Sequence, residues 1–452
     1  MDRPPTPPEF TTAAEDHVAP HARRLRVRAW RDRLRESLLF LPMVLLLSAI
    51  VVEELAAAID RRWQIAALER FALPPDAAVT LLATIAGATI TTAGVVFSLL
   101  LVTLQLASGQ FSPRVLRTFW RDRFGQVLIG LLLAAFAFCV LALTHIDTSA
   151  EAGPPLTMTL ALLLAFTSIL AIVLFLNRIT RNQYVGRIME RISDETLSLI
   201  QELPYGPRVG RRVGDPVEAP ELDKLGLPLV VRSEIDGWVQ QISRRAVVAA
   251  TPPGTVIRIE TRPGAYLVAG EPIATIWPPP DSPISARQSG RVTALIREAV
   301  IIGYARTMQQ DIDFGMRQLN DIALRALSAA VNDPTTAIEV VLRLSSVLRR
   351  LVQADLPHQS VWAGERRILL TPWELDHAEY VTHAFAQLRV YAAPHPQVAL
   401  ALVRAMRMLR SASRHPDASR ALDRQLELML AGCERASMLP ADLDAIRAAA
   451  TA

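Results

Sequence analysis

Two short stretches in the second half of the chain gather side chains that could bind a divalent metal ion. Carboxylates and imidazoles are common ligands for such ions. The first stretch holds Asp311, Asp313, Asp321, Asn332 and Asp333, and the second holds Glu374, Asp376, His377 and His383. Neither stretch has a recognised ligand spacing, and the two histidines are not four positions apart, as a metal-binding pair on one helical face would be. Helix caps, ion ladders and solvated faces explain most of these residues, so we assign no catalytic residue, no metal ligand and no cofactor.

The sequence pattern predicts that the elements carrying these residues are helices throughout residues 301–452. Asp313, Arg317 and Asp321 recur at intervals of four, which predicts an ion ladder along one helical face. Asp333 is a predicted N-cap, with Pro334 at the first helical position. We therefore predict an all-α cytoplasmic domain over 301–452, in which Asp333 and Pro334 have an architectural role.

A small β-rich domain is predicted over 229–300, after a stalk helix and linker over 178–228. Short β-branched runs, including GRVTALI near the end, are separated by Asp-Gly and Pro-Gly turns. The segment RPGAYLVAGEPIATI resembles half of a biotinyl or lipoyl carrier barrel. Those carriers need a lysine at the tip, and this region has none. The resemblance therefore implies a structural or docking barrel without an attached cofactor.

A stripe of small and hydroxylated residues runs through the second of four long apolar runs. Its members follow one another at helical steps of three and four, with Leu101 as an apolar interruption; they are Thr80, Thr84, Gly87, Thr91, Gly94, Ser98 and Gln105. Such a stripe can allow close packing between helices. It can also line a wet path at the centre of an oligomer. The sequence leaves both interpretations open.

Four apolar runs are each long enough to cross a bilayer as a helix, at about 37–59, 78–107, 125–145 and 156–177. Arginine clusters precede the first run, separate the second from the third and follow the fourth. Because basic loops stay in the cytoplasm, this pattern predicts a four-helix membrane domain over 37–177 with both termini inside. Residues 1–36 read as a disordered basic tail without the features of a signal peptide. Glu53 and Glu54, in the first run, are expected to be interfacial rather than buried.

The basic segment between the second and third runs is predicted to anchor the chain to anionic lipid headgroups. Its apolar and basic residues would form the two faces of an interfacial helix; the anchoring residues are Arg114, Arg117, Trp120, Arg121 and Arg123. The formal net charge of +4 reflects arginines at such membrane edges, so we expect no nucleic-acid partner.

Two separated motifs resemble the hallmarks of an uncharacterised bacterial family of predicted integral membrane proteins. The first lies in VFSLLLVTLQLASGQFSPR and the second in NDPTTA. Their order and the four-run layout agree with the family over most of residues 37–410. Members tend to have Pro-Gly before the second motif, where this chain reads SAAVNDPTTA. The resemblance implies a membrane protein of the bacterial inner membrane, and it implies no particular activity.

The leading functional hypothesis is a homo-oligomeric channel or transport protein for ions or small solutes with a cytoplasmic regulatory region. The alternative is a membrane-anchored scaffold or sensor whose second half binds a cytoplasmic partner that the sequence does not identify. A membrane-bound metal-dependent hydrolase ranks third, because no hydrolase motif accompanies the carboxylates and histidines described above.

Overall fold

The computed structural model describes residues 40–62, 73–110, 123–147, 153–182, 185–201, 215–364 and 366–451. The chain divides into two compact units, one within Trp30–Tyr184 and the other containing Val185–Ala452. We describe the first as the membrane unit and the second as the C-terminal unit. The predicted tail over 1–36 lies outside the described residues, as do residues 202–214 of the linker.

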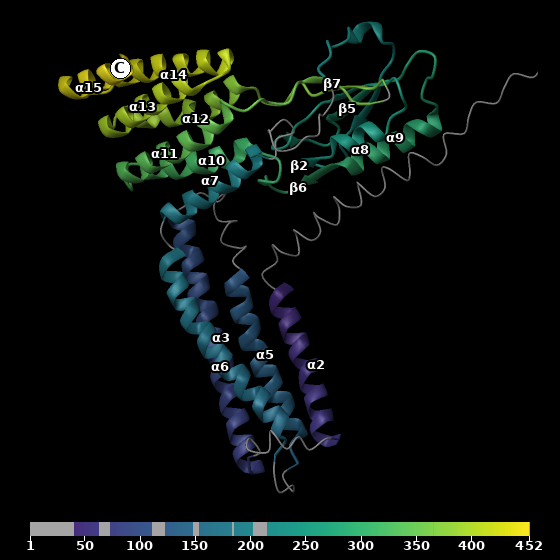
Figure 1. The fold of residues 1–452 in the computed structure, drawn as a ribbon, viewed down its shortest axis with the longest axis vertical. Coiled ribbons are helices and arrows are strands. Elements are labelled where there is room, and N and C mark those ends of the chain that lie inside the picture. The colour runs from purple at the N-terminus through teal and green to yellow at the C-terminus, as the bar shows by residue number, and fades with distance from the viewer. Residues whose placement is uncertain are drawn as a thin grey trace, which may run out of the picture. The chain divides into compact units, whose positions relative to one another are not determined.

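Four helices of the membrane unit are long and apolar enough to cross a membrane (Figure 1). They are α2 (Phe40–Arg62), α3 (Pro75–Gln110), α5 (Arg123–His145) and α6 (Pro155–Asn182). Each overlaps one of the four apolar runs over most of its length, so the prediction of four candidate membrane-spanning helices is confirmed. In hydrocarbon the backbone N–H and C=O groups have no water to bond. A run of about 20 apolar residues therefore forms a helix, in which every interior peptide group is hydrogen-bonded within the segment.

Helix α5 is the centre of the membrane unit and packs against α2, α3 and α6. Its side chains Leu128, Leu132 and Phe138 are almost completely buried. At Gly130 the α2 backbone comes so close that a Cβ atom would lie 2.8 Å from Cα of Pro42. Glycine thus permits the close approach of α2 and α5, as small residues do in membrane helix pairs.

The β strands of the C-terminal unit form two open sheets. The larger sheet has the order β1-β5-β3-β8-β7, and the smaller has the order β4-β2-β6. The strands are β1 (Leu229–Arg232), β2 (Gly237–Ile242), β3 (Val256–Ile259), β4 (Tyr266–Leu267), β5 (Pro272–Trp277), β6 (Val300–Gly303), β7 (Ser360–Trp362) and β8 (Ile368–Leu370). All pairs are antiparallel except β3 with β8, in which Val256 lies opposite Ile368.

The predicted barrel is not confirmed, because the described strands do not close into one. One reason is that GRVTALI belongs to a helix, α9 (Ala286–Ala299). A reciprocal capping box between Ser285 and Gln288 begins this helix. Val292, Ile296 and Ala299 then fall on one buried face, a helical spacing that the β-branched composition concealed.

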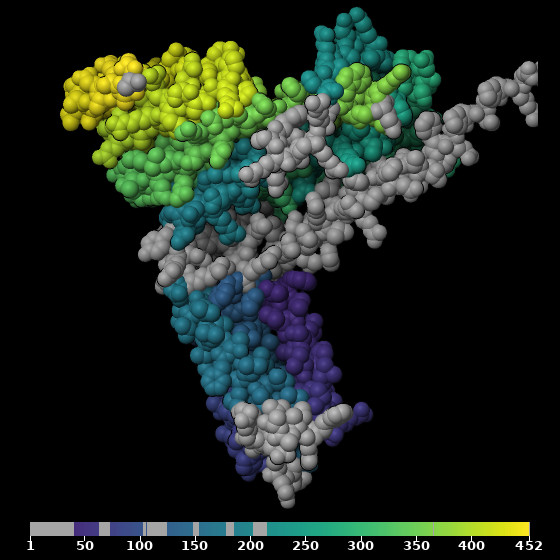
Figure 2. Space-filling view, viewed as in Figure 1, coloured from purple at the N-terminus to yellow at the C-terminus, as the bar shows by residue number. Residues whose placement is uncertain are grey.

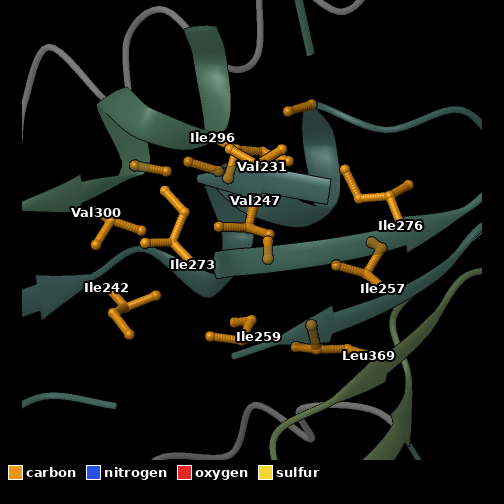
Figure 3. Close-up of a cluster of buried hydrophobic side chains, with 14 of the residues drawn as sticks. Val231, Ile242, Val247, Ile257, Ile259, Ile273, Ile276, Ile296, Val300 and Leu369 are labelled. Atoms are coloured by element: carbon orange, nitrogen blue, oxygen red, sulfur yellow. The ribbon is translucent and has the colours of Figure 1, made fainter. Parts of the chain in front are cut away.

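Both sheets and two helices share one hydrophobic core (Figure 3). Ile257 of β3, Ile273 of β5 and Ile296 of α9 are at most 1% exposed in this core. The second helix is the short α8 (Arg244–Ala249), which contributes Ala246 and Val247. The two sheets and α8–α9 therefore form one packed β-rich region.

The prediction that residues 301–452 are all helix is wrong at three strands, β6, β7 and β8. Strand β8 lies between β3 and β7 in the larger sheet, so the region after residue 300 supplies part of the β core. The expectation failed because strands of three or four residues are too short to show a periodicity of two.

The remaining helices pack as one block (Figures 1 and 2). They are α7 (Val185–Gln201), α10 (Ile312–Ala326), α11 (Pro334–Leu351), α12 (His377–Ala392), α13 (Pro396–Ala412), α14 (Pro416–Arg435) and α15 (Pro440–Thr451). Helix α7 lies where a stalk was expected and packs against α10 and α11, with Ile188, Met189 and Ile192 buried. Proline begins α11, α13, α14 and α15, because its missing N–H is unneeded at the first helical position.

Candidate functional site

The stripe on α3 is exposed along its whole length in the described chain. All seven members, Thr80, Thr84, Gly87, Thr91, Gly94, Ser98 and Gln105, are in the exposed class. The other face of α3 is buried, with Leu82 and Ala78 completely inaccessible where α3 packs against α5. A Cβ atom added at Gly87 or Gly94 would meet nothing within 4 Å. These glycines therefore do not serve close packing among the described helices of one subunit.

The threonine hydroxyls of the stripe donate to carbonyl oxygens of their own helix. Thr80 donates to Asp76 at 2.8 Å, Thr84 to Thr80 at 2.6 Å and Thr91 to Gly87 at 2.8 Å. This back-bonding satisfies the hydroxyl hydrogen without a partner helix. The oxygen lone pairs stay outward and can accept hydrogen bonds from water or a solute.

A buried carboxylate lies in the first membrane helix. Glu53 of α2 is 0% exposed, and its Oε1 lies 3.0 Å from Nδ1 of His145 at the end of α5. Its Oε2 has no hydrogen-bond partner among the described residues. Glu54 is exposed, with Oε1 4.0 Å from Nε2 of His145. The expectation that both glutamates are interfacial rather than buried is wrong for Glu53, because the close packing of α2 on α5 encloses its side chain.

A second acidic residue of α2 caps another helix. Asp60 accepts hydrogen bonds from the backbone N–H of Leu156 at 3.0 Å and of Thr157 at 2.9 Å, and from the Thr157 hydroxyl at 2.8 Å. A carboxylate at this position satisfies the free N–H groups of the first turn of α6 and complements the helix dipole. Sequence reasoning missed this contact, which joins residues 96 positions apart.

The predicted interfacial anchor falls mostly outside the described residues. Arg114, Arg117, Trp120 and Arg121 lie in the segment 111–122, and Arg123 is the first residue of α5.

In the C-terminal unit, Arg306 joins two buried aspartates. Its Nε donates to Asp311 at 2.5 Å, and its Nη2 donates to Asp311 at 3.0 Å and to Asp313 at 2.8 Å. The Arg306 side chain is only 12% exposed, and the Asp313 side chain is 1% exposed. Asp311 is also the N-cap of α10, accepting from the Phe314 N–H at 3.0 Å. We name this set, with Arg317 and His383, the Arg306 network.

Arg317 and His383 also contact the Asp313 carboxylate. Arg317 Nε donates to Asp313 at 2.9 Å, and His383 Nδ1 lies 2.9 Å from its other oxygen. Burial alone raises the pKa of Asp313, but the hydrogen bonds from His383, Arg306 and Arg317 outweigh it and hold the pKa below its ordinary value. Asp313 is therefore a fully engaged carboxylate, which suits an ionic crosslink between helices better than proton transfer.

The structure brings together Asp311 and Asp313 of the first sequence cluster with His383 of the second. Arg306, which organises them, was missed because a single arginine in a loop carries no periodic signal. Two members of the second cluster have other partners: Asp376 caps α12 in a capping box with Glu379, and Glu374 pairs with Arg244 at 2.7 Å.

A family model described as Predicted membrane protein (DUF2254) matches residues 35–408. The chain belongs to this family. Its relatives include the uncharacterized protein Rv1290c of Mycobacterium tuberculosis and the uncharacterized protein Mb1321c of Mycobacterium bovis. Each is 35% identical over 369 residues, which cover 80% of this chain and 69% of the relative. No solved structure matches the chain significantly.

The family assignment confirms the resemblance drawn from the sequence. With its four candidate spans, this DUF2254 chain is a bacterial membrane protein. The family model covers both the exposed stripe of α3 and the Arg306 network, and it ends before α14.

The NDPTTA segment of this DUF2254 chain begins α11. Asp333 is the N-cap and accepts hydrogen bonds from the Thr336 N–H at 3.0 Å and the Thr336 hydroxyl at 2.5 Å, while Pro334 is the first helical residue. These bonds from Thr336 lower the pKa of Asp333. Asn332 takes the left-handed conformation at φ +48°, which asparagine tolerates better than most residues. Asn332, Asp333, Pro334 and Thr336 thus shape the turn into α11.

Proposed function

We propose that this protein assembles with copies of itself and forms a pathway for ions or small solutes along α3. The C-terminal unit acts as its regulatory region. The observation that carries the proposal is the exposure of the complete Thr/Gly/Ser stripe on a helix whose other face is buried. No enzymatic activity is included, because the Arg306 network engages its carboxylates in ion pairs.

The stripe differs chemically from the other exposed faces of the membrane unit. Exposed side chains of α2 include Leu47, Val51 and Leu55, and those of α6 include Phe166 and Ile169, all of which suit lipid tails. Threonine, serine and glycine gain little from contact with hydrocarbon. All three are small enough to allow close approach of a second helix, and the hydroxyls of threonine and serine can accept hydrogen bonds from water. An arrangement in which the stripes of two α3 helices face each other across a layer of water would use both the small size and the hydroxyls of these residues.

Flux through purified protein in liposomes tests this proposal. We expect the wild type to conduct at least one common monovalent cation or anion, and Gly94→Leu and Ser98→Leu to block flux without changing oligomer size, because leucine fills the space for water. Thr91→Ser should stay active, since it keeps the hydroxyl. Val95→Leu is the matched control, because Val95 is exposed beside the stripe and outside it.

Flux and oligomer size must be measured on the same sample. An assembled wild type that conducts nothing, with or without its C-terminal unit, would overturn the pathway and leave the membrane-anchored scaffold or sensor as the better hypothesis. Loss of assembly in Gly94→Leu and Ser98→Leu, together with a silent wild type, would assign the stripe to packing between subunits.

The proposed orientation places both termini in the cytoplasm, with the basic segment between α3 and α5 against anionic headgroups of the inner membrane. It rests on the arginine distribution. Cys139 and Cys433 are both buried, so single cysteines can be introduced at exposed positions. A membrane-impermeant maleimide applied to spheroplasts should label Asp76→Cys and spare Ser198→Cys. Labelling of Ser198→Cys in sealed spheroplasts would reverse the orientation.

A further inference from the structure

A cavity of about 450 Å³ lies in the C-terminal unit, between the segment after α11 and the first turns of α12 and α14. Two histidines line it, His377 as the first residue of α12 and His415 as the N-cap of α14. Their rings stack with centroids 3.9 Å apart and planes inclined by 16°. Asp417, in the first turn of α14, adds a carboxylate to the pair.

The hydrogen bonding of His377 leaves a lone pair that faces a carboxylate. Nε2 of His377 lies 2.9 Å from the carbonyl oxygen of Ala354, and since a carbonyl can only accept, Nε2 must carry the proton. In the neutral ring, Nδ1 is then an acceptor, and it lies 3.7 Å from Oδ2 of Asp417. A cation placed between these two acceptors would interact favourably with both.

The second histidine also presents an unused nitrogen. Nε2 of His415 is buried, has no hydrogen-bond partner in the described part of the chain, and lies 3.9 Å from Oδ1 of Asp355. The His415 side chain makes no capping hydrogen bond to α14, although His415 occupies the N-cap position. One ligand atom from each of His377, His415 and Asp417 lies within 4.8 Å of the others.

We propose that His377, His415 and Asp417 bind one divalent transition-metal ion at the wall of this cavity. Two imidazoles and one carboxylate form a donor set that suits Zn²⁺, Fe²⁺ or Mn²⁺ better than Mg²⁺ or Ca²⁺. The Ala354 carbonyl holds the His377 ring in the tautomer that a metal needs, which is the usual role of such a partner. Three protein ligands leave at least one coordination position open to the cavity.

Closing the site requires a slight approach of His377 and Asp417 and a rotation of the His415 ring. Metal–ligand bonds of about 2.0–2.2 Å bring neighbouring ligand atoms to roughly 3.3 Å in a tetrahedral site, slightly closer than the 3.7 Å between His377 and Asp417. The lone pairs of two stacked rings lie in nearly parallel planes and cannot meet at one ion, so the His415 ring must turn out of the stack. Its side chain is 23% exposed, so its neighbours do not enclose it completely.

The bound ion would crosslink two helices. Helices α12 and α14 already pack against one another, and each supplies ligands from its first turn or cap. Pro416 between His415 and Asp417 fixes the backbone there. The family model ends at residue 408, so two of the three ligands lie beyond it and the proposal concerns this chain itself.

Zinc titration of the full-length protein in detergent, purified without a polyhistidine tag and stripped with a chelator, tests the site. We expect one tightly bound Zn²⁺ per chain and a higher melting temperature with Zn²⁺ present. His415→Asn and Asp417→Asn should each weaken binding by at least about 100-fold and abolish the thermal shift, because each removes one of three ligands. Mn²⁺ should displace Zn²⁺ from the wild type only when it is in large excess, because it binds nitrogen and oxygen ligands more weakly.

His395→Asn is the matched control. His395 is the N-cap of α13 and precedes Pro396, as His415 precedes Pro416, but it belongs to no cluster of metal-ligating side chains found in the described chain. This variant should bind Zn²⁺ like the wild type. A wild type without stoichiometric Zn²⁺, or equal affinity in the wild type and Asp417→Asn, would overturn the proposal. Asp417→Asn keeps the side-chain shape at a partly exposed position, so it decides the question if His415→Asn does not fold.

Discussion

Replacing Arg306 with leucine should lower the free energy of unfolding of the C-terminal unit by about 3–5 kcal/mol. The side chains of Asp311 and Asp313 are 3% and 1% exposed, and Arg306 is the cation that both share. Removing one partner of a buried ion pair leaves the other charge without compensation, which costs more than the pair contributed. Hydrogen–deuterium exchange of peptides that cover α10 gives a local measurement, and we expect faster exchange there.

Arg317→Leu provides the control for Arg306→Leu. The Arg317 side chain is 37% exposed, and Asp313 would keep its bonds to Arg306 and His383. We expect a loss of at most about 1 kcal/mol, as for other partly exposed ion pairs. Equal losses in the two variants would show that the network does not depend on Arg306. Combining Arg306→Leu with Asp311→Asn should recover part of the stability, because it removes one of the unpaired charges.

Gly264→Ala should destabilise the Arg306 network by at least about 3 kcal/mol, because the added methyl group collides with it. A Cβ atom at this position would overlap the Asp311 carboxylate and lie 2.7 Å from Nε and Nη2 of Arg306. Gly264 also has φ +83°, which alone costs a residue with a Cβ about 1–2 kcal/mol. The remainder is the cost of pushing Arg306 and Asp311 apart.

Gly270→Ala separates these two costs. Gly270 has φ +93°, and a Cβ there would meet nothing within 4 Å, so the variant should lose only the backbone contribution. Thermal unfolding and exchange of α10 should therefore change much less in Gly270→Ala than in Gly264→Ala. Similar changes in both variants would mean that the loop at Gly264 moves away and that the close approach to Asp311 is unimportant.

The sequence predicted features that are fixed by local physics. The four apolar runs were found because spanning length and hydropathy are properties of one segment. The start of α11 was found because Asp333 and Pro334 act on their immediate neighbours. The spacing of Gly87 and Gly94 placed both on one face of α3, although spacing alone cannot say whether that face is turned inward or outward.

The features that the sequence could not predict depend on distant contacts. Asp313 meets His383 across 70 positions, and Glu53 meets His145 across 92. Nothing in the local pattern around Glu53 distinguishes a buried carboxylate from an interfacial one, because the packing of α5 decides it. For the same reason the predicted barrel failed, since one of the two neighbours of β3 in the sheet is β8, which comes from the region expected to be helical.

The parallel pairing of β3 with β8 also determines when the larger sheet can be completed during synthesis. More than a hundred residues separate the two strands, and a ribosome that adds about 5–20 residues per second needs roughly 5–20 s to make them. Throughout that interval Ile257, on β3, lies on a strand edge without its final neighbour, which is the kind of surface on which unfinished chains associate. A chain shortened before Ile368 keeps that open edge permanently, so solubility on truncation should depend on whether β8 is retained.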